Sequence, residues 1–370
     1  MKILYFCTYY HRAMIFRDSM NMLAKMGHEM SAFNAVAYNT TIEDKYKSIM
    51  DSSVMHTECF YKWDRLFYHL KQHKIKQALL KSCNVKEFDL IHSHTLLNGG
   101  YALYQIKKRF GVPYIVSVRD TDINTFLKFP LFPKIANKIV KEASGIQFLS
   151  YSYRDLFIDK YINPELKNEA LKKSTVIGNG LEEFWLINKA APKNLEDKRR
   201  IKILSVGSIE KRKDPLTTVN AVKELIDKNY SIQLTFIGQV INKSLLKKIN
   251  KYSFVTVIPF TAQEELINLY RSNDIFILPS ITETFGRAYA EAMSQGLPII
   301  YTKGQGFDGN FTDGDVGFAV PGKDSSYIAD SVIKILTDYS NMSCRCIEKC
   351  SQFDWEQLAH RLSDFYQNVL

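Results

Sequence analysis

The stretch PSITETFGRAYAEAMSQGLPII, from Pro279 to Ile300, decides which fold the chain can adopt. An apolar run ends at Pro279, a helical pattern covers about 286–295, and a second apolar run begins at Pro298. The order strand, loop, helix, strand is typical of the repeating units of an open parallel sheet. Ligands of such sheets bind beyond the carboxyl ends of the strands, so we expect a binding site at this loop.

Two glutamates bracket the turn from loop to helix in this stretch. Glu283 lies in the loop and Glu291 lies in the helix. Backbone N–H groups at Phe285, Gly286 and Arg287 are expected to point at a bound anion or sugar. The two carboxylates can accept paired hydrogen bonds from vicinal hydroxyls. The alternative is that Glu283 caps the helix and Glu291 is a solvated surface residue.

The complete string resembles the signature of the retaining glycosyltransferases of family 4, P-S-x-x-E-x-F-G-x-x-x-x-E-A-M-x-x-G-x-P. Glu283 and Glu291 stand at its two glutamate positions. The resemblance implies that Glu283 binds hydroxyls of the donor sugar and that Glu291 binds the ribose of the nucleotide. It also implies the GT-B fold, in which two Rossmann-like, doubly wound domains face each other across a cleft.

The length of the chain, 370 residues, favours two domains. Apolar runs alternate with helical stretches in the second half, as a doubly wound parallel sheet requires. With the resemblance, we expect an acceptor-binding domain over 1–186 and a nucleotide-sugar-binding domain over 187–350. A terminal helix in 351–370 is expected to return to the first domain. No G-x-G-x-x-G motif is present, so a dinucleotide site is not expected.

The loop GSIEKRKD, residues 207–214, resembles the V-G-R-x-x-x-x-K-G loop of the family, whose cations neutralise the donor diphosphate. Gly207 and Lys213 match that pattern. Ser208 replaces the arginine, and Arg212 is expected to supply the second cation. Fixed cations lower the barrier because the leaving nucleoside diphosphate gains negative charge. The alternative is a solvated run of charges.

Three residues of the first half are candidates for the reacting centre. His94 ends a predicted strand in a segment that resembles the family pattern D-x-x-H-x-H-T, which places it at the mouth of the cleft. Arg119 and Asp122 belong to a V-R-x-T-D segment, where many relatives carry a histidine that touches the donor sugar. Asp122 can equally cap a helix.

Composition and charge narrow the class of partner. The net charge is +10, and residues 1–190 carry 27 Lys and Arg against 18 Asp and Glu. The basic excess therefore lies in the first half, where we expect a phosphate-bearing or anionic partner. No nucleic-acid-binding module is recognisable. Three of the six cysteines cluster near the C-terminus, but their spacing does not match a metal site, so reduced thiols are expected.

Residues 61–81, YKWDRLFYHLKQHKIKQALLK, combine an apolar stripe with flanking cations. A basic amphipathic helix rich in aromatic residues suits the membrane interface, and membrane-associated relatives use such helices. The alternative is a helix that packs its stripe into its own domain. No run approaches the length of a membrane span, and the opening apolar run is too short for a signal peptide. We therefore expect a cytoplasmic protein, with peripheral contact at the inner membrane face.

These observations predict a retaining, metal-independent glycosyltransferase of the hexosyltransferase type, with no cofactor besides the nucleotide-sugar. A UDP-sugar is the favoured donor. The favoured acceptor is a lipid-linked glycan of surface-polysaccharide or glycoconjugate assembly. Two other classes remain open. One is a nucleotide-sugar epimerase with the same fold, and the other is a two-domain sugar-binding protein without catalysis.

Overall fold

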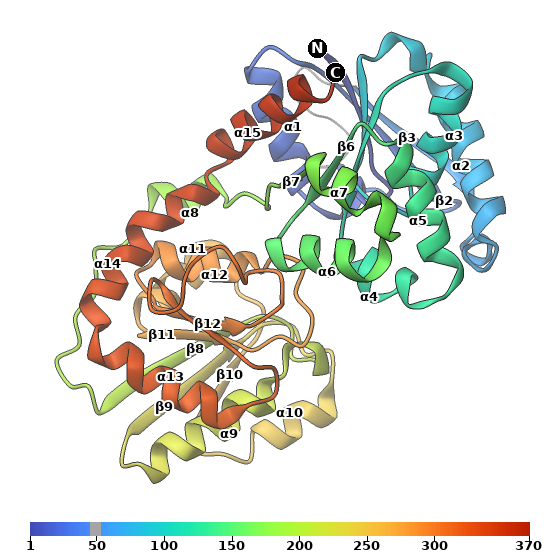
Figure 1. Ribbon diagram of the computed structural model, residues 1–370. Helices are drawn as coiled ribbons and strands as arrows, with labels where there is room; N and C mark the ends of the chain where they lie inside the picture. The colour runs from blue at the N-terminus through green and yellow to red at the C-terminus, as the bar shows by residue number, and fades with distance from the viewer. Residues whose placement is uncertain (45–52) are drawn as a thin grey trace. The chain divides into compact units, whose positions relative to one another are not determined.

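The computed structural model describes residues 1–44 and 53–370, and this part of the chain forms two units (Figure 1). The first unit comprises Met1–Leu149, Tyr153–Gly180 and Trp355–Leu370. The second comprises Leu181–Asp354 with the short segment Ser150–Ser152. The first unit therefore ends at Gly180, where the sequence suggested 186, and it resumes at Trp355, where the sequence suggested 351.

A parallel sheet of seven strands forms the centre of the first unit, in the order β3-β2-β1-β4-β5-β6-β7. The strands are β1 (Lys2–Phe6), β2 (Glu29–Ala37), β3 (Ser53–Phe60), β4 (Leu90–Ser93), β5 (Tyr114–Val118), β6 (Gly145–Phe148) and β7 (Ser174–Val176). The order runs outward in both directions from β1, as in a doubly wound Rossmann sheet.

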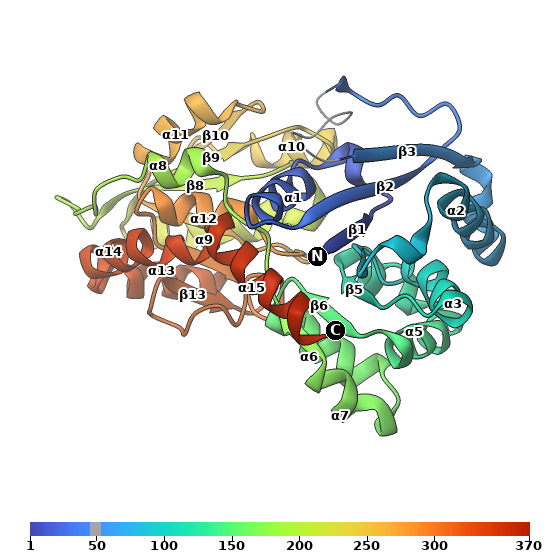
Figure 2. The ribbon, with the colours of Figure 1, turned by 90° about the horizontal axis from the view of Figure 1, so that it is seen from above.

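Helices cover both faces of this sheet (Figure 2). They are α1 (Ile15–Lys25), α2 (Tyr68–Ser82), α3 (Gly100–Phe110), α4 (Asp120–Asn124), α5 (Leu131–Glu142), α6 (Tyr151–Tyr161), α7 (Pro164–Lys172) and α15 (Trp355–Asn368). Short 3-10 turns are η1 (Tyr10–Arg12), η3 (Lys62–Leu66), η4 (Val85–Glu87) and η5 (Phe126–Lys128). Alternate side chains of β1 point to opposite faces of the sheet. Leu4 and Phe6 join the core under α2, α3 and α5, whereas Ile3 and Tyr5 join the core under α1 and α15.

The terminal helix α15 packs beside α1 and is held by buried polar contacts as well as apolar ones. The Ser363 hydroxyl lies 2.8 Å from Nε2 of His28, and the Tyr366 hydroxyl lies 2.7 Å from Nδ1 of His92. Burial lowers the pKa of His92 to about 3, so its ring is neutral at physiological pH. The last residues of the chain thus complete the first unit.

The second unit repeats the same topology with six parallel strands, in the order β10-β9-β8-β11-β12-β13. The strands are β8 (Arg200–Val206), β9 (Ser231–Ile237), β10 (Val255–Ile258), β11 (Ile275–Leu278), β12 (Ile299–Thr302) and β13 (Gly317–Val320). The helices are α8 (Glu183–Ile187), α9 (Pro215–Asp227), α10 (Lys243–Ile249), α11 (Gln263–Arg271), α12 (Arg287–Ser294), α13 (Ser325–Thr337) and α14 (Tyr339–Lys349), with 3-10 turns η6 (Lys211–Lys213) and η7 (Cys350–Phe353).

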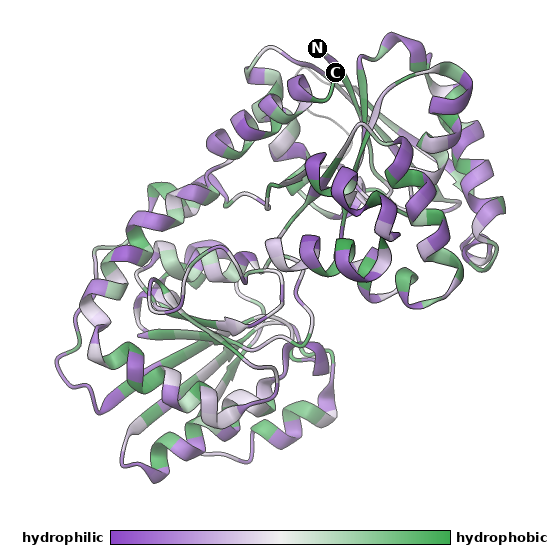
Figure 3. Cartoon of the chain, in the orientation of Figure 1, coloured by the Kyte–Doolittle hydropathy of each residue, from purple (hydrophilic) through white to green (hydrophobic). Residues whose placement is uncertain are grey.

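Strands β11 and β12 of this sheet are buried on both faces, which explains why they are nearly continuous apolar runs (Figure 3). In β11, Ile275 and Ile277 face one core, and Phe276 and Leu278 face the other. The predicted fold class, two Rossmann-like parallel-sheet domains, is therefore confirmed.

One local prediction is wrong: residues 61–81 do not form a single amphipathic helix. The 3-10 turn η3 precedes α2, and Phe67 separates them with φ −116° and ψ 79°. The cause is Asp64, whose buried carboxylate accepts the backbone N–H of Tyr61 at 2.7 Å and the ammonium of Lys74 at 2.7 Å. These bonds hold η3 in a tight turn instead of the first turn of a helix.

None of the described helices has the length and apolar character that a membrane span needs. In residues 1–44 and 53–370, no group of three or more His, Cys, Asp or Glu side chains is arranged to hold a metal ion. All six cysteines, each within the described part, are free thiols.

Candidate active site

A pocket of about 530 Å³ lies in the second unit, beside the carboxyl ends of β8 and β11. We call it the β8–β11 pocket. Between these two strands the order of the sheet reverses, which is where doubly wound sheets bind ligands. It is lined by Glu182, Trp185, Val206, Gly207, Lys213, Phe260, Thr261, Ala262, Gln263, Glu264, Leu266, Leu278, Glu283, Gly286, Arg287, Ala288 and Glu291. Six of the nine residues predicted as site residues in this half of the chain thus lie along one cavity.

Glu283 lies in the loop after β11 and is held from several directions. Its Oε2 atom contacts the ammonium of Lys213, and the Ser280 hydroxyl donates to the same oxygen at 3.2 Å. Its backbone N–H donates to Gln305 Oε1 at 3.1 Å, and its carbonyl accepts the N–H of Gly306 at 2.8 Å. A Cβ on Gly306 would lie 2.4 Å from that carbonyl oxygen, so only glycine allows this approach. The carboxylate is thereby fixed at the pocket wall.

Gly286 begins the following helix, α12, in a left-handed conformation with φ +83°. A Cβ there would lie 2.4 Å from the ring of Tyr289, so this position requires glycine. The side chain of Phe285 is buried in the core against Phe307 and Phe353 and does not line the pocket. Phe285 therefore anchors the loop, and only its backbone is available to a ligand.

Glu291 lies on α12 and faces the same pocket. Its Oε2 atom accepts the Tyr270 hydroxyl at 3.0 Å, and its Oε1 atom lies 3.7 Å from the Arg287 guanidinium. Arg287 also pairs with Glu182 at 2.5 Å. Burial raises the pKa of Glu291, and the nearby Arg287 charge opposes that shift. The carboxylate is thus oriented by one hydrogen bond and one cation, as a fixed acceptor for a polar ligand would be.

The loop after β8 was predicted to bind the donor, and only some of its residues reach the pocket. Gly207 and Lys213 line the pocket, whereas Ser208 and Arg212 turn to Glu210. The Ser208 hydroxyl donates to Glu210 Oε1 at 2.6 Å, and the Arg212 guanidinium donates to it at 3.0 Å and to a backbone carbonyl at 2.9 Å. Although burial alone would raise the pKa of Glu210, these two partners lower it. Glu210 was missed because nothing in its spacing distinguishes it from a solvated charge.

The β10–α11 connection also lines the pocket and was not foreseen. Phe260 is 80% exposed there, and Gln263 and Glu264 follow it. An exposed aromatic ring at a pocket wall is unusual for a side chain with no binding role. No motif in the sequence identifies Phe260, since apolar residues are common in such connections.

His94, Arg119 and Asp122 form a separate group in the first unit. Nε of Arg119 donates to the carbonyl of His94 at 2.7 Å, and the guanidinium lies 5.0 Å from the ring of Phe16. Beside them is a cavity of about 20 Å³, enough for roughly one water molecule. His94 is 4% exposed, and neither ring nitrogen has a hydrogen-bond partner within the described residues. Burial lowers its pKa well below the usual range, so the ring is neutral.

Asp122 was predicted to lie near the reacting groups, and its geometry instead fits the capping alternative. It is fully buried and accepts the backbone N–H groups of Leu96 at 3.2 Å, Leu97 at 2.9 Å and Arg119 at 3.0 Å. Burial raises its pKa to about 6, and the three N–H groups oppose the shift. Three backbone N–H groups thus hold the carboxylate, so Asp122 positions the segment after His94.

The residues at η3 form an exposed apolar and basic surface on the first unit. Tyr61, Trp63, Leu66 and Phe67 are 49%, 54%, 84% and 56% exposed. Lys62 and Arg65 between them are also exposed. We call these six residues the η3 surface.

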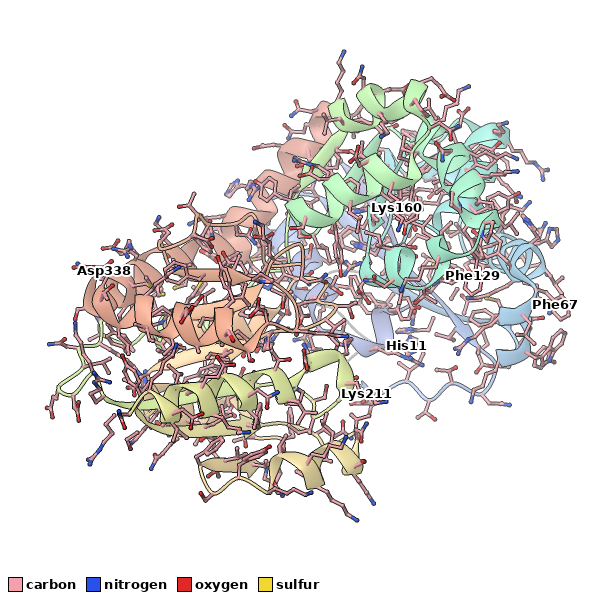
Figure 4. All side chains as sticks on the ribbon, turned by 60° about the horizontal axis from the view of Figure 1, so that its bottom comes forward. His11, Phe67, Phe129, Lys160, Lys211 and Asp338 are labelled. Carbon is pink, nitrogen blue, oxygen red and sulfur yellow. The ribbon has the colours of Figure 1, made fainter. Side chains whose placement is uncertain are left out.

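Of the cations of α2, Lys74 lies at the η3 surface, 5.5 Å from the ring of Tyr61 and 5.1 Å from that of Trp63, whereas Lys71 lies in the interior. The Lys71 ammonium is buried, donates to Asn98 Oδ1 at 3.1 Å and lies 4.9 Å from the Phe60 ring, and burial lowers its pKa to about 8. Ile75, Ala78 and Leu79 of α2 belong to the core. The apolar stripe of α2 is therefore an internal packing face, and the exposed aromatic residues are those of η3. Figure 4 labels Phe67, at the end of this surface, and Phe129 on the same unit.

Among the comparisons with known proteins, the match to a family model falls on the second unit. Residues 186–353 match the family model described as "Glycosyl transferases group 1". An uncharacterized glycosyltransferase of Methanocaldococcus jannaschii is 22% identical over 350 residues, which cover 91% of this chain and 90% of that protein. The capsular polysaccharide biosynthesis glycosyltransferase CapM of Staphylococcus aureus is 29% identical over 242 residues, covering 60% of this chain and 62% of CapM.

Solved structures agree on the fold along the whole chain. HepE of Anabaena, solved in complex with UDP, superposes with a TM-score of 0.72 at 15% identity, covering 100% of both chains. Sucrose-phosphate synthase of Thermosynechococcus elongatus superposes with a TM-score of 0.75 at 16% identity, covering 100% of this chain and 99% of that one. Residues 186–353 therefore match the family of glycosyl transferases group 1, and the chain has the GT-B fold.

Proposed function

We propose that the chain is a retaining glycosyltransferase of family 4 that transfers a hexose from a UDP-sugar to a glycan acceptor. The β8–β11 pocket carries the proposal, because it combines the cations Lys213 and Arg287 with the oriented carboxylates of Glu283 and Glu291. Solved structures of HepE with UDP and with UDP-glucose support the choice of donor.

Each group of the pocket has a part in holding the donor under this proposal. Glu291, oriented by Tyr270, accepts the ribose hydroxyls. The diphosphate takes the ammonium of Lys213 from Glu283, and the freed carboxylate then accepts hydrogen bonds from the sugar hydroxyls. Arg212 becomes a second cation for the diphosphate only if it leaves Glu210. Charge neutralisation is assigned to these side chains and to the amino end of α12, with no metal ion.

The proposed reaction retains the configuration at the anomeric carbon. The bond from that carbon to the diphosphate oxygen breaks, and a bond to the acceptor hydroxyl oxygen forms on the same face of the sugar. The hydroxyl proton passes to a phosphate oxygen of the departing diphosphate, so no enzyme nucleophile is needed. Lys213 lowers the barrier because it stabilises the charge that develops on the leaving group.

The acceptor is assigned to the first unit. Arg119 is the polar side chain of that unit that we assign to the acceptor, with His94 supporting it through the backbone contact at 2.7 Å. A lipid-linked glycan at an anionic membrane surface fits the basic excess of residues 1–190. On this view the η3 surface inserts its aromatic side chains at the bilayer interface while Lys62 and Arg65 face lipid phosphates. The name of CapM supports an acceptor of polysaccharide assembly.

The test is turnover with a panel of UDP-, GDP- and ADP-hexoses, followed as nucleotide release and by NMR of the anomeric proton of the sugar product. We expect slow release from one UDP-sugar with retained configuration, reduced about 100-fold or more in Lys213→Met. Inverted product would contradict retention. Interconversion of the sugar within the intact nucleotide-sugar would instead identify an epimerase.

A further inference from the structure

A second pocket of the second unit, of about 280 Å³, collects three lysines that the proposed transfer does not use. Lys211 of η6, Lys248 of α10 and Lys323 after β13 line it. All three side chains are exposed, and within the described residues none of them forms an ion pair. Figure 4 labels Lys211, which lies in η6 shortly before α9. We call this cavity the lysine pocket.

Three ammonium groups around one cavity repel each other unless an anion joins them. Asp214 is the carboxylate among the lining residues, and its Oδ2 atom accepts the Thr217 hydroxyl at 2.7 Å. One carboxylate, already hydrogen-bonded, does not balance three cations. The excess positive charge of the cavity is the property that an anion-binding site requires.

Apolar side chains also line the lysine pocket. Leu245 is 7% exposed, Ile281 is 39% exposed, and Leu216 lies beside them. A lining that combines lysines with apolar side chains matches a ligand that carries both a phosphoryl group and an apolar part. Lys323 adopts φ +63°, a conformation that side chains other than glycine, asparagine and aspartate rarely take.

We propose that the lysine pocket binds a small molecule with a phosphoryl group, held by Lys211, Lys248 and Lys323. The assignment does not depend on the transferase reaction. It has a consequence for that reaction, because Lys211 and Lys213 belong to the same 3-10 turn and the N–H of Ile281 donates to the carbonyl of Arg212 at 2.8 Å. An occupied lysine pocket therefore constrains the turn that carries Lys213 of the β8–β11 pocket.

The experiment is titration calorimetry of the full chain with inorganic pyrophosphate at fixed ionic strength. The test variant is Lys248→Gln with Lys323→Gln. The matched control is Lys243→Gln with Lys247→Gln, which removes two exposed lysines from α10 that do not line the cavity. A third protein, Lys213→Gln, tests whether pyrophosphate binds in the β8–β11 pocket instead, because Lys213 lines that pocket.

We expect wild type, the control and Lys213→Gln to bind pyrophosphate, with at least about a tenfold loss of affinity in the test variant. Equal losses in the test and control variants would mean that net charge alone attracts the anion, and would overturn the proposal. Loss only in Lys213→Gln, or no binding by wild type, would overturn it as well. None of these results measures nucleotide-sugar turnover, so the proposed function is tested separately.

Discussion

The ammonium of Lys213 contacts the carboxylate of Glu283 inside the β8–β11 pocket, although the two residues lie 70 positions apart in the chain. Lys213 closes the turn after β8, and Glu283 follows β11, which is the neighbouring strand of the sheet. The two side chains are only 13% and 11% exposed. The doubly wound topology therefore brings two oppositely charged groups together in the β8–β11 pocket.

Mutual dependence of this pair is measurable in a double-mutant cycle with Lys213→Met and Glu283→Leu. Each single change leaves a mostly buried charge without its partner. We therefore expect the losses of unfolding free energy in the two single variants to add up to more than the loss in the double variant. The expected coupling is about 1–3 kcal/mol in the unfolding free energy of the second unit. The exposed pair Lys228 and Asp330, at 3.1 Å, is the control, with an expected coupling below about 1 kcal/mol. Additive losses at Lys213 and Glu283 would contradict the pairing.

Phe260 is expected to contribute to nucleotide affinity and little to stability. The Phe260→Ala change removes a ring that is 80% exposed, so the melting temperature should stay within about 1 °C of wild type. If the ring stacks on the base, UDP affinity falls about 5–20-fold in titration calorimetry. Ile241→Ala removes another exposed apolar side chain of the same unit, 58% exposed and outside the β8–β11 pocket, and should leave affinity unchanged. Equal UDP affinities of Phe260→Ala and wild type would show that Phe260 does not contribute to nucleotide binding.

Vesicle binding should depend on the η3 surface and not on the buried Lys71 of α2. Replacing Leu66 and Phe67 by serine should weaken co-sedimentation with phosphatidylserine-containing vesicles about tenfold or more, because two exposed apolar side chains no longer enter the interface. Lys71→Met should leave vesicle binding unchanged, since that ammonium is buried and bonded to Asn98. Ile187→Ser, at a site 73% exposed in the second unit, is the control. Undiminished binding by the Leu66 and Phe67 variant would refute this membrane contact.

The buried carboxyl of Asp122 predicts a pH dependence of stability. Its folded pKa of about 6 lies above its usual value, so the folded state binds the proton more tightly than the unfolded state does. Its stabilising contribution is therefore present below the unfolded pKa and is lost as the pH rises through about 6. Relative to Asp122→Asn, wild type should lose about 2 kcal/mol of unfolding free energy between about pH 4 and pH 6.5 in urea titrations. A difference that stays constant with pH would show that the carboxyl titrates normally.

How far the sequence predicts this molecule depends on how local the determining contacts are. The stretch from Pro279 to Ile300 is predicted well, because its strand, left-handed Gly286 and helix α12 are fixed by neighbouring residues. Asp122 could not be assigned, because its N–H donors Leu96 and Leu97 come from a segment about 25 residues away. Contacts of that kind are set by tertiary packing, which no local pattern encodes.

The same reasoning explains the wrong prediction at residues 61–81 and the unforeseen contacts in the loop after β8. The apolar spacing of 61–81 fits a helix, yet Asp64 is bonded to Lys74 and to the backbone of Tyr61, and these bonds divide the segment. Likewise, Arg212 was assigned to a ligand from its place in the loop, but Glu210 two residues earlier already accepts it. In both cases a single carboxylate decides the geometry, and its partner cannot be read from spacing.

The measurement that tests the central claim most directly is the affinity for UDP, by titration calorimetry, of wild type beside Glu291→Gln and Glu196→Gln. Glu291 lines the β8–β11 pocket, whereas Glu196 is an exposed glutamate of the same unit outside it. The account predicts that wild type and Glu196→Gln bind one UDP equally and that Glu291→Gln binds at least about tenfold more weakly. Equal binding by all three proteins, or none by wild type, would contradict the assignment of this pocket to the nucleotide-sugar.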